Sequence, residues 1–390
     1  MRRSPSRRLV LGAGLAALAA APATTAAAAA PASYASRSLG RARATYDALG
    51  TYLDAADGTG LVREQYPAAA DDRPYSYEWP YSQVHIAALD LAHADPRYAP
   101  ELARRARAQE HYWNAAGGTT GLPGYASYPV APHGAGGDMF YDDNEWVGLA
   151  KIQRHLQTGE KAALRRAEEI FALIASGWDT DQDHAAPGGV FWTQADWSQD
   201  RNTVSNMPGA QLGLRLHRIT GRASYLEAAR RFYDWTNRHL LSPEGLYWDH
   251  LGLTSTVDRT LWSYNQGVPV GVGVLLYEAT HDRDHLRNAR RTAEAAYTYY
   301  VTEGRLLDQP VFFNSIFFKN LLLLESVTGG RTYQQAMADY ADHIWSQQRD
   351  SATGLMRFGS AGTTQAIEQA AAAQIFAVLA WPRSSLPTLY

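Results

Sequence analysis

Val204–Leu240 reads VSNMPGAQLGLRLHRITGRASYLEAARRFYDWTNRHL, and this stretch contains the unit from which the fold can be predicted. Its first part, 204–219, is apolar on most sides, which is typical of a helix that is buried all round. Ile219-Thr220-Gly221 then marks a tight turn. Arg222–Leu240 carries charged residues on one stripe and apolar residues on the other, as a helix with one face in water does. The stretch therefore predicts a helical hairpin with one buried and one half-exposed member.

The same unit recurs about every 60 residues from Ser33 onward. The buried members are expected at 81–93, 142–157, 204–219, 263–279, 312–327 and 364–380. These six helices are followed by only five amphipathic ones, but Ser33–Leu53 supplies a sixth that can pair with the last buried helix. The pattern predicts an all-α, single-domain (α/α)6 barrel. The alternative, an open helical solenoid, would need polar caps at both ends.

Residues 1–32 have the features of a signal peptide of the twin-arginine type. Met1–Arg8 carries four arginines, Leu9–Ala21 is apolar, and Ala30-Pro31-Ala32 suits cleavage. The apolar stretch of about 13 residues is shorter than the about 20 that a transmembrane helix needs. We therefore expect a secreted protein without a membrane anchor, whose mature domain is 33–390.

The composition excludes several classes of protein. The absence of cysteine rules out disulfides, thiolate nucleophiles and iron-sulfur clusters. A net charge of −3, from 36 basic and 39 acidic residues, leaves no basic surface for nucleic acid. The 23 Tyr, 11 Trp and 10 Phe are the unusual feature, and many lie in Gly-rich or Pro-rich stretches, as in proteins that stack sugar rings.

Metal binding has little support in the sequence, and neither a metal nor a cofactor is expected. The histidines are scattered, and the one pair with the His-x-x-x-His spacing of a zinc site, His281 and His285, has its first member in the predicted turn Thr280-His281-Asp282 and not within a helix. Asp179, Asp181 and Asp183 alternate as in a calcium loop, but Val190 stands where an EF-hand needs Glu. A nonstandard calcium site at these aspartates stays open.

The long connections all enter the predicted buried helices, whereas the other turns have three or four residues. They run from about nine residues at 303–311 to nearly thirty at 54–80 and 114–141. Every buried helix begins at the same end of the barrel, so these loops share one rim. Because long loops are where function concentrates, this rim should hold the active site.

Asp142 and Asp143 begin the second buried helix, in the stretch Phe140-Tyr141-Asp142-Asp143-Asn144-Glu145-Trp146. An Asp at a helix start often caps the helix, which is the alternative explanation. Neighbouring helical side chains diverge by about 100°, so two carboxylates can flank one bond, near the roughly 5 Å separation of retaining glycosidases. Their repulsion raises one pKa toward that of a general acid and leaves the other group an anionic nucleophile.

Other rim segments are rich in residues that suit hydroxyl-bearing rings, namely amides, an arginine and aromatic faces. Any one of them is more often a packing or capping group, and only their convergence on one rim favours sugar binding. The candidates from these segments are Trp79, Tyr81, Gln83, Asn206, Asp249, Tyr264, Asn265, Gln266, Arg357 and Phe358.

From Tyr34 to about Trp381 the chain resembles family 76 of the glycoside hydrolases, the bacterial and fungal endo-α-1,6-mannanases. The most specific element is Tyr141-Asp142-Asp143-Asn144-x-Trp146. Asn202-x-x-Ser205-Asn206, with its Thr220-Gly221 turn, and Tyr264-Asn265-Gln266-Gly267 support it.

The resemblance implies an (α/α)6 barrel and a retaining mechanism, with Asp142 as nucleophile and Asp143 as acid/base. It adds Trp146 as an aromatic of the motif and implies that Asp249 and Arg357-Phe358 hold the sugar at the cleavage point. One departure is Val147, where many members have a second Trp.

The sequence thus predicts a secreted, monomeric, retaining endo-α-1,6-mannanase that acts on an α-mannan polysaccharide. One alternative is a mannan transglycosylase, in which a sugar intercepts the same intermediate. A second is a noncatalytic glycan-binding barrel, in which the two aspartates only cap a helix. A third, an epimerase or lyase, would need a His or Tyr on the rim as the proton-transfer group, with His133 and His250 as the histidine candidates.

Overall fold

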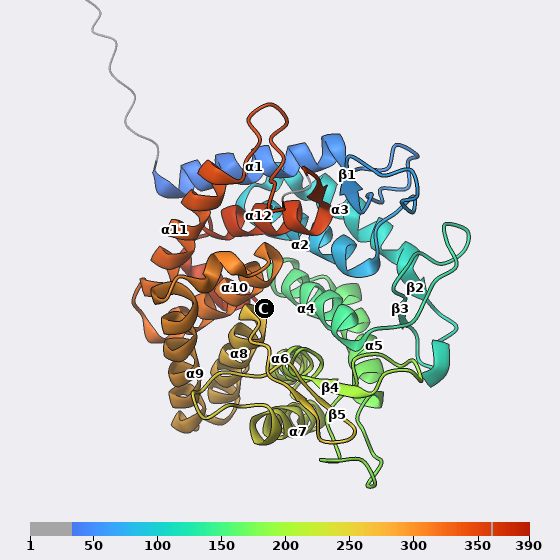
Figure 1. The fold of residues 1–390 in the computed structure, drawn as a ribbon, viewed down its shortest axis with the longest axis vertical. Coiled ribbons are helices and arrows are strands. Elements are labelled where there is room, and N and C mark those ends of the chain that lie inside the picture. The colour runs from blue at the N-terminus through green and yellow to red at the C-terminus, as the bar shows by residue number, and fades with distance from the viewer. Residues whose placement is uncertain (1–32, 360–361) are drawn as a thin grey trace, which may run out of the picture. The chain divides into compact units, whose positions relative to one another are not determined.

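The computed structural model describes residues 33–359 and 362–390, so the predicted signal peptide 1–32 lies outside the described residues. Tyr34–Tyr390 forms one compact unit of paired helices (Figure 1). Among the described residues, six helices make the inner layer: α2 (Glu78–Ala94), α4 (Tyr141–Thr158), α6 (Thr203–Thr220), α8 (Ser263–Thr280), α10 (Val311–Thr328) and α12 (Ala366–Val378).

The inner helices form a closed ring. Each packs against the next along the chain, and α12 packs against α2. They are buried on most faces because neighbours and outer helices cover them; in α8 every residue from Ser263 to Leu276 is buried. The closed ring confirms the predicted (α/α)6 barrel and excludes the open solenoid.

An outer helix covers each inner helix, as the amphipathic pattern predicts. The outer helices are α1 (Tyr34–Tyr52), α3 (Ala99–Gln109), α5 (Lys161–Ser176), α7 (Ala223–His239), α9 (Arg283–Ala296) and α11 (Thr332–Gln347). In α5, for example, Ala163, Ala167, Ile170 and Ile174 share one buried stripe at helical spacing. The first helix, α1, packs against the last inner helix, α12, which is the predicted pairing.

The short turns that follow α4 and α6, at the floor of the barrel, the end opposite the rim, each begin with a glycine. Gly159 and Gly221 have φ values of 75° and 72°, in the left-handed region that favours glycine. The N–H of Gly159 donates to the carbonyl oxygen of His155 at 2.8 Å and so closes the last turn of α4. The Thr-Gly pairs in the sequence therefore mark true helix ends.

The connections at the other end carry short strands that the sequence analysis did not anticipate. They pair antiparallel as β1 (Gln65–Tyr66) with β7 (Thr364–Gln365), as β2 (Trp113–Asn114) with β3 (Gly124–Tyr125), and as β4 (Asp200–Asn202) with β5 (His250–Gly252) and β6 (Val257–Asp258). The pairs β1–β7 and β4–β5 link loops that are far apart in the sequence, whereas β2–β3 and β5–β6 are local. They hold the rim in one shape.

The barrel interior is filled at the floor end by the last residues of the chain, whose end lies at the centre of Figure 1. Lys319 and Asp90 form an ion pair at 2.7 Å, and neither side chain is exposed. The Lys319 ammonium also donates to the hydroxyl of Tyr390 at 3.1 Å. Arg215 donates to the backbone oxygens of Pro387 and Leu389. The floor is therefore closed, and only the rim end is open to a large ligand.

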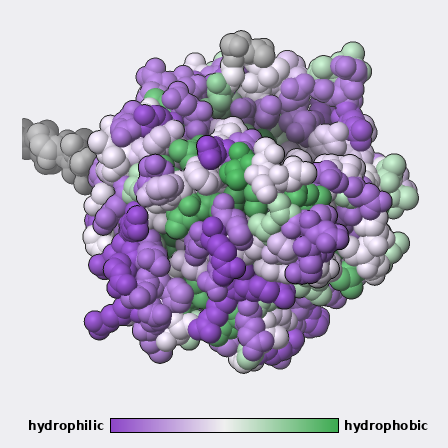
Figure 2. Space-filling model, turned by 60° about the horizontal axis from the view of Figure 1, so that its bottom comes forward, coloured by the Kyte–Doolittle hydropathy of each residue, from purple (hydrophilic) through white to green (hydrophobic). Residues whose placement is uncertain are grey.

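Among the described residues, α10 is the helix long and apolar enough to cross a membrane. Of its apolar window, 78% is buried inside the barrel, which is the position of a core helix. The outer surface, in contrast, is mostly hydrophilic on the side that Figure 2 shows, with a band of hydrophobic side chains across the middle.

Candidate active site

A cleft of about 780 Å³ opens at the end of the barrel where the inner helices begin. Its walls come from the first turns of the inner helices and from the loops that precede them, so the cleft lies on the rim that the long connections predict. The lining residues are Glu64, Tyr77, Trp79, Pro80, Ser127, Asp138, Phe140, Asp142, Asp143, Trp192, Asp200, Asn202, Val204, Asp249, His250, Trp262, Tyr264 and Phe313.

Asp142 and Asp143 lie in the first turn of α4, and both line this cleft. Phe140 occupies the N-cap position of α4, so neither aspartate is the capping residue. The indole Nε1 of Trp192 donates to Oδ2 of Asp142 at 3.2 Å. Oδ1 of Asp142 is buried and has no hydrogen-bond partner. One oxygen of Asp142 is therefore held in place while the other remains unbonded.

The two carboxyl groups differ in their electrostatic surroundings. Burial raises the pKa of Asp142 to about 7, although the indole N–H of Trp192 acts in the opposite direction. Burial, and then the charges of Asp142 and Glu78, raise the pKa of Asp143 well above its usual range. The first group to ionise is thus Asp142, and Asp143 keeps its proton to higher pH.

Two further acidic residues, Glu78 and Glu145, are buried in the barrel near Asp142 and Asp143. Glu78, the first residue of α2, is fully buried, and its Oε1 accepts from Gln109 Nε2 at 2.7 Å. Glu145 is also fully buried, and neither of its carboxyl oxygens has a partner. Burial, followed by the charge of Asp142, raises the pKa of Glu145 well above its usual range. These groups make a second negative charge beside Asp142 costly.

An extended segment, Val190–Gln194, forms the cleft wall that carries Trp192. Thr193 pairs with Phe140 in an antiparallel bridge, and the N–H of Tyr141 donates to the Trp192 oxygen at 2.9 Å. Oδ1 of Asn206 accepts from the N–H of Val190 at 2.9 Å. Asn206 is fully buried, so this predicted sugar ligand instead fixes the wall that presents Trp192 to Asp142.

The opposite wall is aromatic. Tyr264 and Phe313 stack in parallel, with ring centroids 3.9 Å apart and an interplanar angle of 6°. Trp79 stacks on Phe313 at 6.0 Å, and Trp262 packs against the same ring at 5.4 Å. The structure therefore places Trp79 and Tyr264 on the cleft, where the sequence predicts them.

Asp249 is also on the cleft, and its neighbours orient it. Its Oδ1 accepts from Asn265 Nδ2 at 3.0 Å, and its Oδ2 lies 2.9 Å from Nδ1 of His250. This hydrogen bond raises the pKa of His250. Asn265 is buried and does not line the cleft, so its part is to position Asp249.

Two clusters of acidic side chains, one around Asp249 and one around Asp179, could be considered as metal sites. One potential ligand atom each from Asp249, His250 and Asp258 lies within 4.8 Å of the others, and Nδ1 of His250 is already hydrogen-bonded to Oδ2 of Asp249 at 2.9 Å. Asp179 accepts from the buried guanidinium of Arg201 at 2.6 Å. Arg201 thus takes the place of a cation beside the alternating aspartates.

Four predicted sugar ligands lie in the barrel interior instead. Tyr81, Gln83, Trp146 and Gln266 are fully buried and absent from the cleft walls. The Tyr81 hydroxyl donates to two backbone carbonyl groups, and the Gln266 amide accepts from the backbone N–H of Tyr247 and donates to the backbone oxygen of the same residue. The helical period explains the correction, because these positions point into the ring or toward an outer helix and not up from the rim.

Arg357 and Phe358 also lie outside the cleft. Arg357 forms an ion pair with Asp350 at 2.7 Å and donates to the Gly362 oxygen at 2.6 Å. Phe358 lines a separate pocket of about 480 Å³. The structure therefore assigns neither residue to the site of the acid pair, contrary to the expectation from the family resemblance.

Several cleft residues escaped the sequence analysis, above all Glu64, Asp138, Trp192 and Phe313. Trp192 had a weak signal, since it stands in an apolar stretch that follows Gly188-Gly189. The others are single residues whose neighbours on the cleft are far away in the sequence, so no local pattern marks them.

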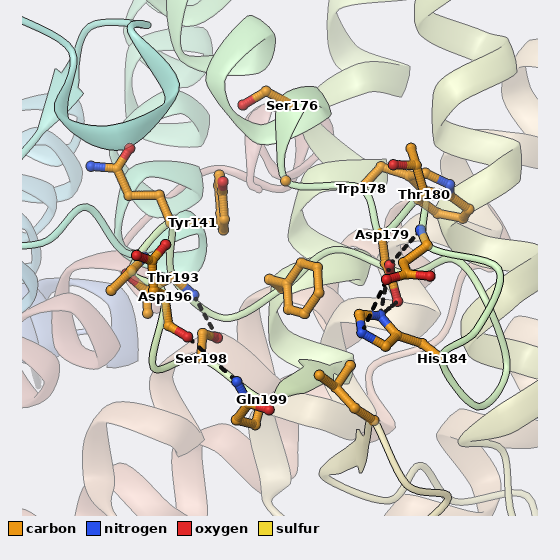
Figure 3. Close-up of a pocket in the computed structure, with 16 residues that line it drawn as sticks. Tyr141, Ser176, Trp178, Asp179, Thr180, His184, Thr193, Asp196, Ser198 and Gln199 are labelled. Atoms are coloured by element: carbon orange, nitrogen blue, oxygen red, sulfur yellow. Dashed lines mark hydrogen bonds and ion pairs between the residues drawn. The ribbon is translucent and has the colours of Figure 1, made fainter.

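A second pocket, of about 490 Å³, lies behind the Trp192 wall (Figure 3). Phe191 and Thr193 line this pocket, whereas Trp192 between them lines the cleft, as expected for alternating side chains of an extended segment. Figure 3 shows His184 bonded to Asp179 on one side of the pocket and Tyr141 on the other. The acid pair is absent from this pocket, so Val190–Gln194 separates it from the chemistry.

The chain is similar to solved structures of the same architecture. The structure of a glycoside hydrolase family 76 mannosidase, Bt3792 of Bacteroides thetaiotaomicron, superposes with a TM-score of 0.78 at 22% identity, covering 88% of this chain and 98% of that one. An inactive variant of the α-1,6-mannanase GH76A of Salegentibacter sp. HEL1_6, with two adjacent aspartates replaced, was solved with α-1,6-mannotetrose. It superposes with a TM-score of 0.70 at 18% identity, covering 90% and 99%.

Curated relatives match a shorter part of the chain. Mannan endo-1,6-alpha-mannosidase DCW1 of Candida glabrata is 31% identical over 164 residues, 37% of this chain and 36% of that protein. The DCW1 protein of Candida albicans is 30% identical over 174 residues, 41% and 38%. The matched segments thus span little more than a third of these relatives. The model of Glycosyl hydrolase family 76, in contrast, matches residues 41–387, which include every helix of the closed ring as well as Asp142 and Asp143, and the chain therefore belongs to that family.

Proposed function

We propose that this protein is a retaining endo-α-1,6-mannanase that hydrolyses α-1,6-linked mannan backbones through a glycosyl-enzyme intermediate. The observation that carries the proposal is the pair Asp142 and Asp143 in one cleft, with unlike surroundings. The names of the related proteins, which are mannosidases and α-1,6-mannanases, support the choice of substrate.

The chemistry follows from the two environments. Asp142, the first of the pair to ionise, attacks the anomeric carbon, while the indole of Trp192 orients its carboxylate. Asp143, whose pKa is held higher, donates its proton to the leaving oxygen. It then takes a proton from the water that hydrolyses the glycosyl-enzyme, so acid and base are one group.

The aromatic wall and Asp249 supply substrate binding in this proposal. Tyr264 and Trp79 offer apolar ring faces to the sugar, and the Asp249 carboxylate accepts hydrogen bonds from hydroxyl groups. The cleft carries acids and no Lys or Arg among its lining residues, so a neutral polysaccharide suits it and a polyanion does not.

The test is incubation of the mature protein with linear α-1,6-mannan, with Asp142→Asn and Asp143→Asn in parallel. Proton NMR follows the anomeric configuration of the first product, and a reducing-end assay follows its amount. We expect α-configured oligosaccharides from the wild type alone. Binding without release would identify a glycan-binding barrel, β-configured first products would refute retention, and products longer than the substrate would identify a transglycosylase.

We also propose that residues 1–32 direct export by the twin-arginine route, on the pattern of arginines, apolar residues and Ala30-Pro31-Ala32. N-terminal sequencing of protein collected from the culture medium tests this. A new terminus near Ser33 is expected. Unprocessed protein that remains in the cells would refute export, and unchanged export after replacement of Arg7 and Arg8 by Lys would refute the twin-arginine route.

A further inference from the structure

Four aromatic side chains at the mouth of the cleft, Tyr77, Phe140, Trp192 and Trp197, belong to neither hydrophobic core of the described residues. Trp197 is the most exposed of the four, with 53% of its surface accessible. An exposed indole forgoes the stabilisation that burial of its apolar surface would bring. Trp197 therefore contributes little to folding where it stands, which points to a ligand.

Trp197 is nevertheless held in one orientation. Its Nε1 donates to Oδ2 of Asp138 at 3.1 Å, and its ring packs against Phe140 at 6.0 Å. Asp138 is itself fixed, since its backbone oxygen accepts from the N–H of Ser127 at 2.9 Å. A side chain already fixed in this way loses little conformational entropy when a ligand binds it, which favours affinity.

The position of Trp197 relates it to the acid pair. Its ring is 6.1 Å from that of Trp192 and at 84° to it, and the indole of Trp192 contacts Asp142. Trp192 lines the cleft, whereas Trp197 does not. Trp197 is thus one ring farther out than the residue that touches the nucleophile, a separation close to the length of one sugar unit.

The chemistry of the surroundings selects the ligand. The exposed face of an indole stacks on the apolar C–H face of a pyranose ring, while Asp138 and Asp196 beside it offer acceptors for hydroxyl groups. These acids, together with Asp142 and Asp143, disfavour anionic polymers. A neutral sugar of the same chain that occupies the cleft satisfies all of these conditions.

We propose that Trp197, oriented by Asp138, is a stacking site for a mannose unit outside the cleft, and that it makes the enzyme act faster on long chains than on short ones. The site rests on the proposed function and extends it from the cleavage point to the preferred chain length. Contacts this far from the reacting bond contribute through the binding energy of remote sugar units.

The experiment measures kcat/KM for wild type and Trp197→Ala on α-1,6-linked mannose oligosaccharides of increasing length and on linear mannan. For the wild type we expect kcat/KM to rise stepwise at the length that reaches Trp197. For Trp197→Ala the step disappears, so long substrates lose about tenfold, while the shortest cleaved substrate keeps its kcat/KM. Trp197→Phe, which keeps an aromatic face, restores most of the step.

Leu307→Ala is the matched control, because Leu307 is 55% exposed and does not line the cleft. It should leave the length dependence unchanged. If Trp197→Ala lost the same factor in kcat/KM on substrates of every length, Trp197 would only support Trp192, and the proposal would be overturned. An unaltered rise of kcat/KM with length in this variant would overturn it as well. If the wild type cleaves no member of the series, the proposed function itself fails, and that result is visible before any variant is compared.

Discussion

Replacement of the proposed nucleophile, Asp142→Asn, should abolish turnover and at the same time stabilise the protein. Asn is nearly isosteric with Asp, and its oxygen can still accept from the Trp192 indole. The change therefore removes a buried ionisable group without opening a cavity. Active sites often lower the stability of the folded protein in this way, because a charge needed for chemistry is held in a poorly solvated position.

The magnitude follows from the pKa of Asp142, which burial raises from 3.8 to about 7. A carboxyl group with a higher pKa in the folded than in the unfolded state binds more protons when folded between these two values. The stability present below pH 4 is therefore lost as the pH rises to 7. The loss is about 4 kcal/mol above pH 7 and about 2 kcal/mol at pH 5.

Differential scanning calorimetry of wild type and Asp142→Asn at pH 5 and pH 8 checks this reasoning. For a unit of this size the expected gain in Tm is about 2 °C at pH 5 and about 5 °C at pH 8. Asp95→Asn is the control of opposite sign, since hydrogen bonds from Arg97 lower the pKa of Asp95 to about 2; it should melt below the wild type at pH 8. The account would be refuted if the difference in Tm between Asp142→Asn and the wild type did not grow with pH, or if Asp142→Asn melted below the wild type.

Four further outcomes are expected. The kcat/KM on mannan falls as the pH drops below about 7, because Asp142 must be ionised to attack; a profile flat down to pH 5 would contradict its raised pKa. Trp192→Phe removes the indole N–H that lowers this pKa, so the acid limb of the pH profile should move up by about one unit, and an unmoved limb would count against the hydrogen bond. Lys319→Met leaves Asp90 buried without its partner and should lower the free energy of unfolding by about 3–5 kcal/mol in urea titrations, with recovery in the double variant Lys319→Met/Asp90→Leu. Dialysis against a chelator should leave the rate of mannan cleavage unchanged, because two carboxyl groups supply the chemistry; activity restored only by an added divalent cation would show otherwise.

The fold could be predicted closely because helical periodicity and turn residues are local properties of the chain. The stretch 204–240 predicts a buried and an amphipathic helix, and the structure has α6 at Thr203–Thr220 and α7 at Ala223–His239. The pairing of α1 with α12 followed from counting helices. The short rim strands were missed, since pairs such as Gln65 with Gln365 join segments about 300 residues apart and have no local pattern.

The site was predicted in part, and the errors that concern residues on the inner helices have one physical cause. Asp142, Asp143, Trp79, Tyr264 and Asp249 stand on the cleft as expected. Polar or aromatic residues near the start of an inner helix were also expected there, but each step along a helix turns a side chain by about 100°. Burial therefore differs sharply between near neighbours, and polar side chains such as Gln83 and Gln266 are used to join helices inside the barrel.

The sequence by itself determined the closed helical barrel, the rim that bears the site, and the acid pair with the roles that the proposal gives it. These features depend on periodicity, loop length and adjacent residues, which are local properties of the chain. Only the tertiary structure decided which side chains meet around that pair. Trp192 reaches Asp142 from 50 residues away, Glu78 approaches it from another helix, and Trp197 extends the aromatic surface beyond the cleft. Such contacts depend on how separate loops fold over one rim, and solvation at that rim sets the pKa values on which the chemistry rests.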